Sequence, residues 1–308
     1  MPCPLGHDKR NYIDWLCVGI VCAGICHEVS MTTTSANLTR AELPVDQEAP
    51  HLNPDQQKWP LKIYTFGRFG LVRDGVPLHF AGKVPRKPLE LLKALIACGG
   101  RGVSEEQLID HLWPNRDEGD ATHSFSSALH RLRLLLGENQ FIPRQDRRIT
   151  LDQSYCWVDA WAFERLTKQA QSLMQQGESD HSPALQTALQ AIVHYTGPFL
   201  PSDADQLWSI SMRERLRDKM RNLITMVGQY WEASTEWHTA LAIYQKGLEA
   251  DDLYEDFYQR QMICYGQLGN HGEVASVYQR CRITLAMLGV KPSPRTTTVY
   301  EAALSSLK

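Results

Sequence analysis

The chain has 308 residues and a formal net charge of −3, and 43% of its residues are hydrophobic and 22% charged. This length is enough for two domains with hydrophobic cores. The composition excludes a chain that is disordered throughout, because such chains lack apolar and aromatic residues, and it excludes collagen-like and low-complexity chains. A slightly acidic total argues against nucleic-acid binding only if the charge is spread evenly.

Residues 1–58 are expected to form a flexible N-terminal extension. Residues 32–58 are rich in Thr, Pro, Gln and acidic side chains and have no periodicity. The apolar stretch 13–26 resembles a signal-peptide core, but His27 and Glu28 stand where small residues would mark cleavage. It is also shorter than the roughly 18 residues that a membrane-spanning helix needs. We therefore expect a cytoplasmic protein without a membrane partner, and a non-native or mis-assigned start to the chain.

The eight cysteines fall into two groups. Four lie near the start beside two histidines: Cys3, Cys17, Cys22 and Cys26, with His7 and His27. They contain no Cys-x-x-Cys pair, so a metal site is an alternative that their spacing does not favour. The others lie inside apolar patterns, which predicts buried thiols in a reducing compartment: Cys98, Cys156, Cys264 and Cys281.

Regular structure is predicted to begin near residue 59 with a β-hairpin. Apolar residues recur from Leu61 to Phe80, and Arg73-Asp74-Gly75 supplies a turn. A helix is predicted next, with Pro88 in its first turn and Gly99-Gly100 at its end.

A second helix is predicted to begin at Ser104 and to stop before Pro114. Gln107, three residues after Ser104, completes the pattern of a capping box. An acidic loop is expected after this helix, over residues 115–120.

A third helix is predicted from about Ala121 to Leu136, and its two faces differ. One face is an apolar stripe with helical spacing, made of Phe125, Leu129, Leu132 and Leu136. The opposite face is polar and cationic, and it consists of His123, Ser124, Ser126, Ser127, His130, Arg131 and Arg133. Gly137 is expected to end the helix.

A second, short hairpin is predicted over residues 141–151, with its turn at Gln145 and Asp146. It carries three arginines near its tip: Arg144, Arg147 and Arg148. Hairpin, three helices and hairpin is the element order of a winged helix-turn-helix. Such a domain needs one helix that buries one side and offers short polar and cationic side chains to the major groove, and the third helix does this.

From residue 159 onward the pattern is helical, which predicts an all-α domain. Helices are expected over about 159–176, 182–196, 206–234, 237–250, 252–268, 271–288 and 294–307. Tyr244-Gln245-Lys246 recurs 34 residues later as Tyr278-Gln279-Arg280, and Trp231 recurs as Tyr265. Because 34 residues is the period of tetratricopeptide (TPR) helix pairs, we predict a TPR-like repeat domain.

Two further patterns in this domain have structural explanations. Arg213, Arg217 and Arg221 recur every four residues beside Glu214 and Asp218, which predicts ion pairs within one helix. Aromatic residues are expected to pack between helices, with a ligand groove among them as the alternative: Trp208, Trp231, Tyr244, Phe257 and Tyr278.

Motifs of the common enzyme classes are absent from the sequence. It has no Walker phosphate loop, no zinc-protease motif, no nucleophile elbow and no dinucleotide-binding glycine fingerprint. The eleven histidines include no pair with ligand spacing on a helix. We expect no catalytic site, no metal and no cofactor, with an enzyme of unrecognised type as a rival.

Residues 61–158 resemble the winged-helix DNA-binding domain of the OmpR type, and Ala128-Leu129-His130-Arg131-Leu132-Arg133 resembles the core of that family's recognition helix. The rest resembles the bacterial transcriptional activator domain. The segments that carry this second resemblance are Val158-Asp159, Phe163-Glu164-Arg165-Leu166 and Leu288-Gly289-Val290-Lys291-Pro292-Ser293-Pro294. Over about 250 residues, the chain thus resembles the Streptomyces antibiotic regulatory protein (SARP) family.

This resemblance implies a transcription factor that binds double-stranded promoter DNA, often at direct repeats, and helps to recruit RNA polymerase. It places the DNA-contact helix at 121–136 and the wing at 141–151. The family often has Arg-Asn at the start of this helix, where the chain has Thr122-His123, so base preference is not carried over. In OmpR-type proteins the loop before the recognition helix can contact polymerase.

In this chain the corresponding loop carries Asp117, Glu118 and Asp120. We take these acids as hypothetical contacts for RNA polymerase or a sigma factor, with a merely solvated loop as the alternative. A homodimer on direct repeats is a further expectation.

We therefore predict a flexible extension (1–58), an α+β winged helix-turn-helix domain (59–158) and an all-α TPR-like activator domain (159–308). The predicted function is sequence-specific transcriptional activation. The alternative is a TPR-like interaction or signalling protein without specific DNA binding, whose polar helix face and hairpin tip are simply solvated.

The distribution of charge favours DNA binding. Residues 59–158 hold 14 basic and 11 acidic side chains, so the acidic total conceals a basic segment. Within 18 residues of it lie Arg131, Arg133, Arg144, Arg147 and Arg148.

Overall fold

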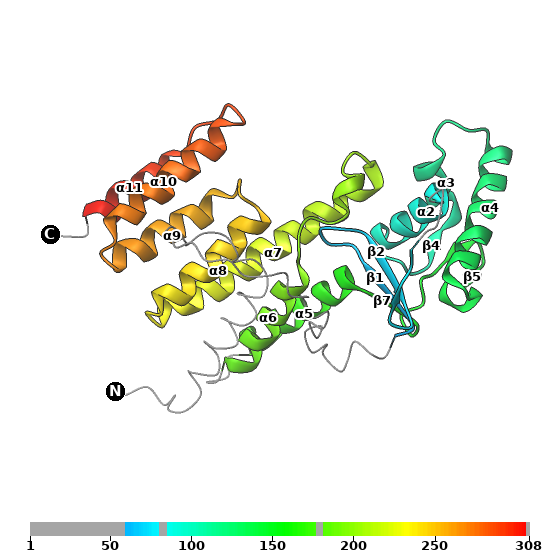
Figure 1. Ribbon diagram of the computed structural model, residues 1–308, viewed down its shortest axis with the longest axis horizontal. Coiled ribbons are helices and arrows are strands. Elements are labelled where there is room, and N and C mark those ends of the chain that lie inside the picture. The colour runs from blue at the N-terminus through cyan, green and yellow to red at the C-terminus, as the bar shows by residue number, and fades with distance from the viewer. Residues whose placement is uncertain (1–58, 80–84, 177–180, 306–308) are drawn as a thin grey trace, which may run out of the picture. The chain divides into compact units, whose positions relative to one another are not determined.

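The computed structural model describes residues 59–79, 85–176 and 181–305, and Figure 1 shows how their helices and strands are arranged. The expectations for residues 1–58 lie outside these ranges. They are the flexible extension, the apolar stretch 13–26 and the alternative metal site at Cys3, Cys17, Cys22 and Cys26. Within the described ranges, no helix combines the length and the apolar character that crossing a bilayer demands.

The described chain begins with the predicted hairpin. Strand β1 (Leu61–Tyr64) pairs antiparallel with β2 (Gly70–Arg73), which pairs with β3 (Val76–Pro77). The turn between β2 and β3 lies at Asp74 and Gly75, which both have positive φ. This is the two-residue turn whose twist matches that of the strands it joins.

A strand that the sequence did not predict completes this sheet. Strand β7 (Cys156–Val158) lies parallel to β1, and the strand order is β3-β2-β1-β7. Three residues are too few to show an alternating pattern, so a strand of this length is invisible in the sequence. The four-stranded sheet lies between helices α2–α4 on one side and α5–α6 on the other (Figure 1).

Three helices follow the hairpin: α2 (Arg86–Ala97), α3 (Glu105–Leu112) and α4 (Glu118–Leu136). Their apolar faces meet in a common core, in which the ring of Phe125 packs edge-on against Trp113 at 6.4 Å between ring centroids. Gly99 and Gly100 end α2 and Gly137 ends α4, all with positive φ, as predicted.

A second sheet, with strand order β4-β6-β5, connects the ends of these helices. Its strands are β4 (Val103–Ser104), β5 (Arg144–Gln145) and β6 (Arg148–Ile149), and the 3₁₀ turn η2 (Asn139–Phe141) leads into β5. The hairpin of β5 and β6 is therefore held against the start of α3, because β4 runs directly into that helix.

Two local predictions for residues 104–120 were wrong. Helix α4 begins at Glu118, so Glu118 and Asp120 belong to its first turn and not to a loop. Carboxylates in a first turn are stabilised by the positive end of the helix dipole. The capping box is absent as well: Ser104 pairs with Arg148 in the β ladder, and Gln107 donates to the Cys98 sulfur at 3.6 Å.

The rest of the described chain is helical and follows the predicted helices within three residues at each end. Its elements are α5 (Asp159–Gln175), α6 (Ser182–His194), the 3₁₀ turn η3 (Pro201–Asp203), α7 (Leu207–Ala233), α8 (Trp237–Ala250), α9 (Glu255–Gln267), α10 (His271–Ala286) and α11 (Pro294–Ser305).

Helices α7 to α10 pack as a series of neighbours in chain order, and α11 packs on α9 and, less extensively, on α10, which fits a TPR-like arrangement. Tyr244 of α8 is fully buried, and its ring lies so close to Gly228 of α7 that a Cβ there would come within 2.3 Å of it. On the next helix, Phe257 packs against Tyr244 at 6.2 Å. Tyr278, the repeat counterpart of Tyr244, stacks on Tyr300 of α11 at 4.1 Å.

The ion pairs predicted within α7 form for two of the three arginines in the predicted pattern. Arg217 pairs with Glu214, and Arg221 pairs with Asp218 at 3.1 Å and with Asp251 of the loop after α8 at 2.5 Å. The prediction was wrong for Arg213, which binds main-chain carbonyls instead.

The predicted burial of the cysteines is confirmed for three of the four that lie in the described ranges. Cys156, Cys264 and Cys281 are buried and free, whereas Cys98 is only half-buried, because it lies at the end of α2. Burial raises the pKa of the Cys156 and Cys264 thiols to about 12, with Asp152 adding to the effect at Cys156 and Glu232 at Cys264.

Candidate nucleic-acid interface

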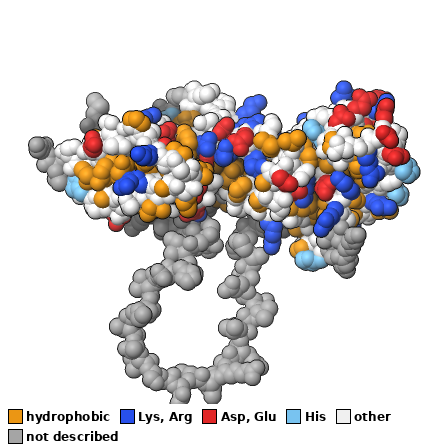
Figure 2. Space-filling view, turned by 90° about the horizontal axis from the view of Figure 1, so that it is seen from above, with side chains coloured by type: hydrophobic (Ala, Val, Ile, Leu, Met, Phe, Trp, Pro, Cys, Tyr) orange, Lys and Arg blue, Asp and Glu red, His pale blue; other side chains and the backbone are white. Residues whose placement is uncertain are grey.

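The exposed face of α4 is the first candidate for contact with nucleic acid. His123, His130 and Arg131 are exposed, and the three serines of the face, Ser124, Ser126 and Ser127, are half-buried beside them. The face points outward because the apolar positions of α4 lie together on its other side: Ala121, Phe125, Ala128, Leu129, Leu132 and Leu136. Figure 2 shows basic, acidic and histidine side chains mixed over the end of the molecule that carries α4.

Arg131 is the arginine of this face that has no partner in the described part of the chain. Within the described ranges its guanidinium has no hydrogen bond and no ion pair, and the imidazoles of His123 and His130 also have none. Ser124 differs, because its hydroxyl accepts a hydrogen bond from Arg116 Nη1 at 2.8 Å, which ties the loop before α4 to the helix.

Arg133, by contrast, is occupied within the protein. Its Nε and Nη2 donate to the main-chain oxygen of Ile142 at 3.1 and 2.7 Å. Partial burial lowers the pKa of its guanidinium, and the nearby charge of Arg144 lowers it further. Arg133 therefore joins α4 to the segment that enters the β5–β6 hairpin.

Arg144 is also occupied, in an ion pair with a buried carboxylate. Its Nε and Nη2 donate to the two carboxylate oxygens of Glu105, with the Nη2–Oε2 distance at 2.8 Å. The Glu105 side chain is 2% exposed and that of Arg144 is 42% exposed. A two-pronged pair of this kind fixes geometry as well as charge, so Arg144 anchors the hairpin to α3.

The tip of the hairpin lies one residue later than predicted, at Asp146 and Arg147. Both have positive φ, 48° and 57°, which closes a two-residue turn. Arg147 is largely exposed and lies 3.7 Å from an exposed carboxylate, that of Glu106. Arg148 turns back, and its Nη1 donates to the main-chain oxygen of Gly102 at 2.8 Å. Arg147 is thus the hairpin arginine least held by the protein.

The three acidic residues proposed as polymerase contacts are all exposed: Asp117, Glu118 and Asp120. Asp117 occupies the N-cap position of α4, but its side chain makes no capping bond. The three carboxylates therefore lie at the N-terminal end of the helix whose exposed face carries the candidate base contacts.

One residue of this surface escaped the sequence analysis. Leu134 is 69% exposed and lies one turn after His130 and Arg131. The signal was present in the sequence, because Leu134 falls outside the spacing of the apolar stripe that ends at Leu136. An exposed leucine on an otherwise polar face adds an apolar contact point to it.

The segment Val158-Asp159 has a structural role at the start of the helical part. Asp159 is buried, and its carboxylate accepts hydrogen bonds from the main-chain nitrogens of Thr65 and Phe66 at 2.7 and 3.0 Å and from the Thr65 hydroxyl at 2.5 Å. Burial raises the pKa of Asp159, and these hydrogen bonds oppose the rise. Asp159 thus ties α5 to the end of β1.

The segment before α11 has a comparable role. Glu255 of α9 accepts hydrogen bonds from the main-chain nitrogen and the hydroxyl of Ser293, both at 2.9 Å, and from the Thr296 hydroxyl. Burial alone would raise the pKa of Glu255, but these hydrogen bonds outweigh it and lower that pKa below its usual value. The segment ending in Ser293-Pro294 thus docks α11 on α9.

Three comparisons with known proteins bear on this arrangement. Residues 158–304 match the model of the bacterial transcriptional activator domain. The fold is similar to that of Mycobacterium tuberculosis EmbR in complex with a low-affinity phosphopeptide, with a TM-score of 0.60 and 20% identity. That match covers 80% of this chain and 65% of the EmbR chain, so the chain spans about two thirds of that protein's length. No curated protein matches the sequence significantly.

At 20% identity the likeness to EmbR shows the fold alone. The match to the domain model is more specific for the helical part. It runs from the end of β7 to α11 and so includes Asp159, Glu255 and Ser293. Residues 158–304 of this chain match the bacterial transcriptional activator domain, and the chain has a fold similar to that of EmbR.

Proposed function

We propose that the chain is a transcriptional regulator, acting as an activator, that binds double-stranded promoter DNA through α4 and the β5–β6 hairpin. The observation that carries this proposal is the exposed face of α4, where Arg131, His123 and His130 have no partner in the described ranges. The match of residues 158–304 to an activator domain supports the same function.

The element order supports a winged helix-turn-helix. Helices α2, α3 and α4 are followed by a hairpin that pairs with β4, the strand before α3. In this arrangement α4 is the recognition helix and lies in the major groove. Its short polar side chains meet base edges there, and an arginine meets guanine or a phosphate.

The hairpin arginines divide into contacts and supports. Arg147, exposed at the turn, reaches toward the phosphate backbone or a minor groove, whose negative potential favours arginine. Arg133, Arg144 and Arg148 are held by protein atoms, so they fix the hairpin at one distance from α4 and add long-range positive charge. The protein acts by positioning partners, without a catalytic step or cofactor.

A competition titration tests this function. Purified protein is first used to select its preferred site from a random duplex library, and binding to that site is then competed with random duplex. A sequence-specific regulator prefers its site by at least about a thousandfold. Equal binding to both duplexes would contradict the proposal. A second copy on an adjacent direct repeat gives two proteins per duplex in the same assay.

The acidic residues at the start of α4 are proposed to contact RNA polymerase or a sigma factor. Replacing Asp117, Glu118 and Asp120 by Ala is expected to lower transcription from the selected site while leaving DNA affinity unchanged. The matched control removes three exposed acids from the helical part, Asp252, Glu273 and Glu301. Equal losses of affinity and transcription would contradict this contact.

One observation favours a second candidate function, protein interaction without specific DNA binding. Four large apolar side chains are exposed close together at the end of α10 and just after it: Ile283, Met287, Leu288 and Val290. Exposed apolar groups of this kind are typical of protein-binding surfaces. The competition titration separates the two functions, since a pure interaction protein shows no preferred duplex.

A further inference from the structure

The end of β1 and the segment that follows α6 are joined by main-chain hydrogen bonds. Gly67 N donates to Pro198 O at 3.0 Å and Leu200 N donates to Thr65 O at 2.8 Å, so residues 198–200 run along the end of β1 like an added strand. We call residues 196–203 the clasp. It links the helical part (159–305) to the part that carries α4 (59–158).

The two backbones of this junction are in direct contact. At Gly197 a Cβ atom would lie 2.9 Å from the Cα of Gly67, closer than a side chain and a backbone atom approach. Thr196 adds a side-chain hydrogen bond, from its hydroxyl to Phe66 O at 3.1 Å. The clasp therefore has no room to slide along β1.

Leu200, within the clasp, has a strained backbone. Its φ and ψ are 44° and 63°, in the left-handed region that a leucine seldom adopts. Such a conformation persists only where surrounding contacts over-determine it. Here its side chain is buried, and its amide is bonded to Thr65 O.

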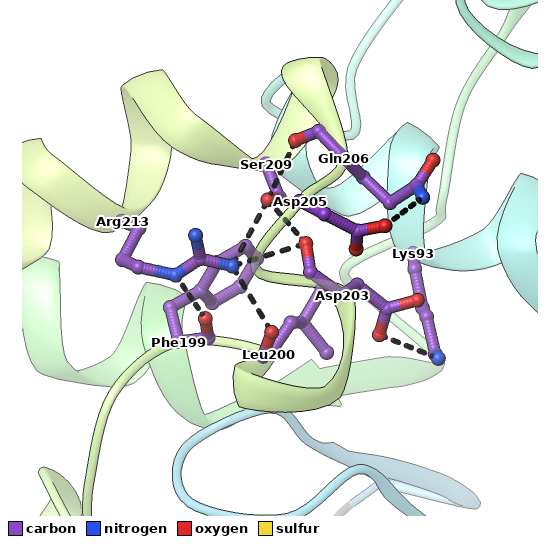
Figure 3. Close-up of polar contacts among 8 residues, drawn as sticks. All are labelled: Lys93, Phe199, Leu200, Asp203, Asp205, Gln206, Ser209 and Arg213. Carbon is purple, nitrogen blue, oxygen red and sulfur yellow. Dashed lines mark hydrogen bonds and ion pairs between the residues drawn. The ribbon is translucent and has the colours of Figure 1, made fainter.

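Arg213 of α7 shapes the far end of the clasp (Figure 3). Its guanidinium donates to the carbonyl oxygens of Phe199, Leu200, Asp203 and Ala204 at 2.9 to 3.2 Å. One side chain thus binds four carbonyl oxygens of the clasp and of the residue after it. Two of them also accept main-chain hydrogen bonds, Leu200 O from Asp203 N at 3.0 Å and Asp203 O from Gln206 N at 3.1 Å, so Arg213 reinforces a turn that the backbone also stabilises.

The residue that Arg213 positions is Asp203, which faces Lys93 of α2. The Lys93 Nζ–Asp203 Oδ2 distance is 2.7 Å, and the two side chains are only 14% and 12% exposed. Lys93 Nζ also lies 4.9 Å from the centre of the Phe69 ring. Because α2 packs against α4, this ion pair connects the helical part to the layer that supports the recognition helix.

We infer that Lys93 and Arg213 are positioning residues, which lock the clasp so that the helical part is held in one orientation relative to α4. This inference rests on the proposed function for its consequence: on bound DNA, the helical part is then presented at one rotational phase of the duplex. A contact between the helical part and polymerase then forms only when the protein's binding site lies on the suitable face of the DNA.

Two variants break the clasp in different ways. Lys93→Ala leaves Asp203 without its partner, and Gly197→Val forces the clasp away from Gly67. Lys93→Arg keeps the charge and is the conservative rescue. The matched control is Lys246→Ala, which breaks an ion pair of the same length within α8, that of Lys246 with Glu249 at 2.7 Å.

The first measurement needs no DNA. Backbone ¹⁵N relaxation of the full chain is expected to give one tumbling time for α4 and α9 in the wild type and the control. In Gly197→Val, and more weakly in Lys93→Ala, the two helices are expected to give different times. Identical times for all four proteins, with the variants folded, would overturn the inference.

The second measurement is transcription from promoters in which the selected site is moved by 5 or 10 base pairs. Every protein in this assay, the wild-type reference included, carries Asp117→Ala, Glu118→Ala and Asp120→Ala, so that the remaining contact with polymerase is made by the helical part. With the wild type, activity is expected to fall at least fivefold at 5 base pairs and to return at 10. In the clasp variants, DNA affinity is expected to stay within twofold of the wild type. Their activities at 5 and at 10 base pairs are expected to differ by less than twofold. Lys93→Arg is expected to restore the wild-type difference between the two spacings. An unchanged phase dependence in the clasp variants would overturn the inference.

The two measurements keep this inference separate from the proposed function. If the wild type lacks a preferred duplex, the proposed function fails, while the relaxation data still decide whether the clasp holds the two parts together.

Discussion

The exposed face of α4 and the β5–β6 hairpin both carry arginines, but the charges stand in different situations. Arg131 on α4 has no partner in the described ranges, whereas Arg144 and Arg148 on the hairpin are bound to Glu105 and to a main-chain oxygen. Within the described ranges, the arginines available to a partner are therefore Arg131 on the helix and Arg147 at the hairpin tip, whose contact with Glu106 is exposed and long. The other two hairpin arginines, Arg144 and Arg148, fix the hairpin's place beside α3 and the segment that leads into it.

This difference has an energetic reason. A free surface arginine loses little when it meets a phosphate, since it is already solvated and has no bond to break. An arginine that is paired with a buried carboxylate must either keep that partner or leave a buried charge unpaired, which is costly. Replacing the free arginine with alanine should therefore lower DNA affinity, whereas replacing the paired arginine should mainly lower the stability of the fold.

The largest expected effect is on DNA affinity, from Arg131→Ala. Loss of a base contact by arginine costs about 1–3 kcal/mol, so affinity is expected to fall by about tenfold to a hundredfold. Melting temperature is expected to stay the same, because Arg131 holds no other group. Titration of the selected duplex checks the first part and thermal unfolding the second; a stability loss would show that α4 depends on this side chain.

Arg144→Ala is expected to act mainly on stability. It leaves the buried Glu105 carboxylate without its partner, at a cost of about 1–3 kcal/mol once the partial exposure of Arg144 is considered. Urea unfolding measures this loss. The double variant Glu105→Gln, Arg144→Ala should recover part of it, because the unpaired charge is then gone. A variant as stable as the wild type would mean that the pair contributes nothing.

Arg133→Ala is expected to have a smaller effect on stability, about 1 kcal/mol, from loss of the two hydrogen bonds to Ile142 O. Arg133→Lys should recover only part of the loss, because a lysine lacks the planar fork that reaches one oxygen with two nitrogens. Hydrogen exchange at the hairpin amides shows whether the hairpin loosens. Unchanged exchange there would place the role of Arg133 elsewhere.

The smallest expected effect comes from a substitution at the hairpin tip that removes a charge and leaves the turn intact. Arg147 has a positive φ that glycine adopts without strain, and its contact with Glu106 is exposed and weak. Arg147→Gly removes a left-handed conformation that costs an L-residue roughly 1–2 kcal/mol, but it adds roughly 0.5–1 kcal/mol of backbone entropy cost on folding. Stability is therefore expected to stay the same or to rise slightly, and DNA binding is expected to weaken. If affinity is unchanged, the hairpin tip does not contact DNA.

Much of this fold follows from the sequence, for identifiable reasons. The helices after residue 159 are long and have regular apolar spacing, and their ends fell within a few residues of the predictions. Local signals also sufficed for the Asp74-Gly75 turn and for Gly137 at the end of α4. The start of α4 was misjudged because Glu118, Gly119 and Asp120 look like a loop, although two of them suit a first helical turn.

The candidate site was predicted in outline but not in its chemistry. The apolar stripe that ends at Leu136 fixed which face of α4 is exposed, so His123, His130 and Arg131 were found. Whether a candidate arginine is free to contact DNA, however, depends on protein partners that are distant in sequence. Glu105 lies 39 residues before Arg144, and no local pattern reveals such a pair. The clasp, which joins segments more than 100 residues apart, is hidden for the same reason.

The most direct test of the account compares Arg131→Ala with Arg144→Ala in one experiment. The affinity of each variant for the selected duplex is measured at two salt concentrations, at a temperature where both are fully folded. We predict that Arg131→Ala binds at least about tenfold more weakly than the wild type, while folded Arg144→Ala stays within about threefold of it. The reverse order, or equal losses, would contradict the claim that the exposed face of α4 is where this protein meets DNA.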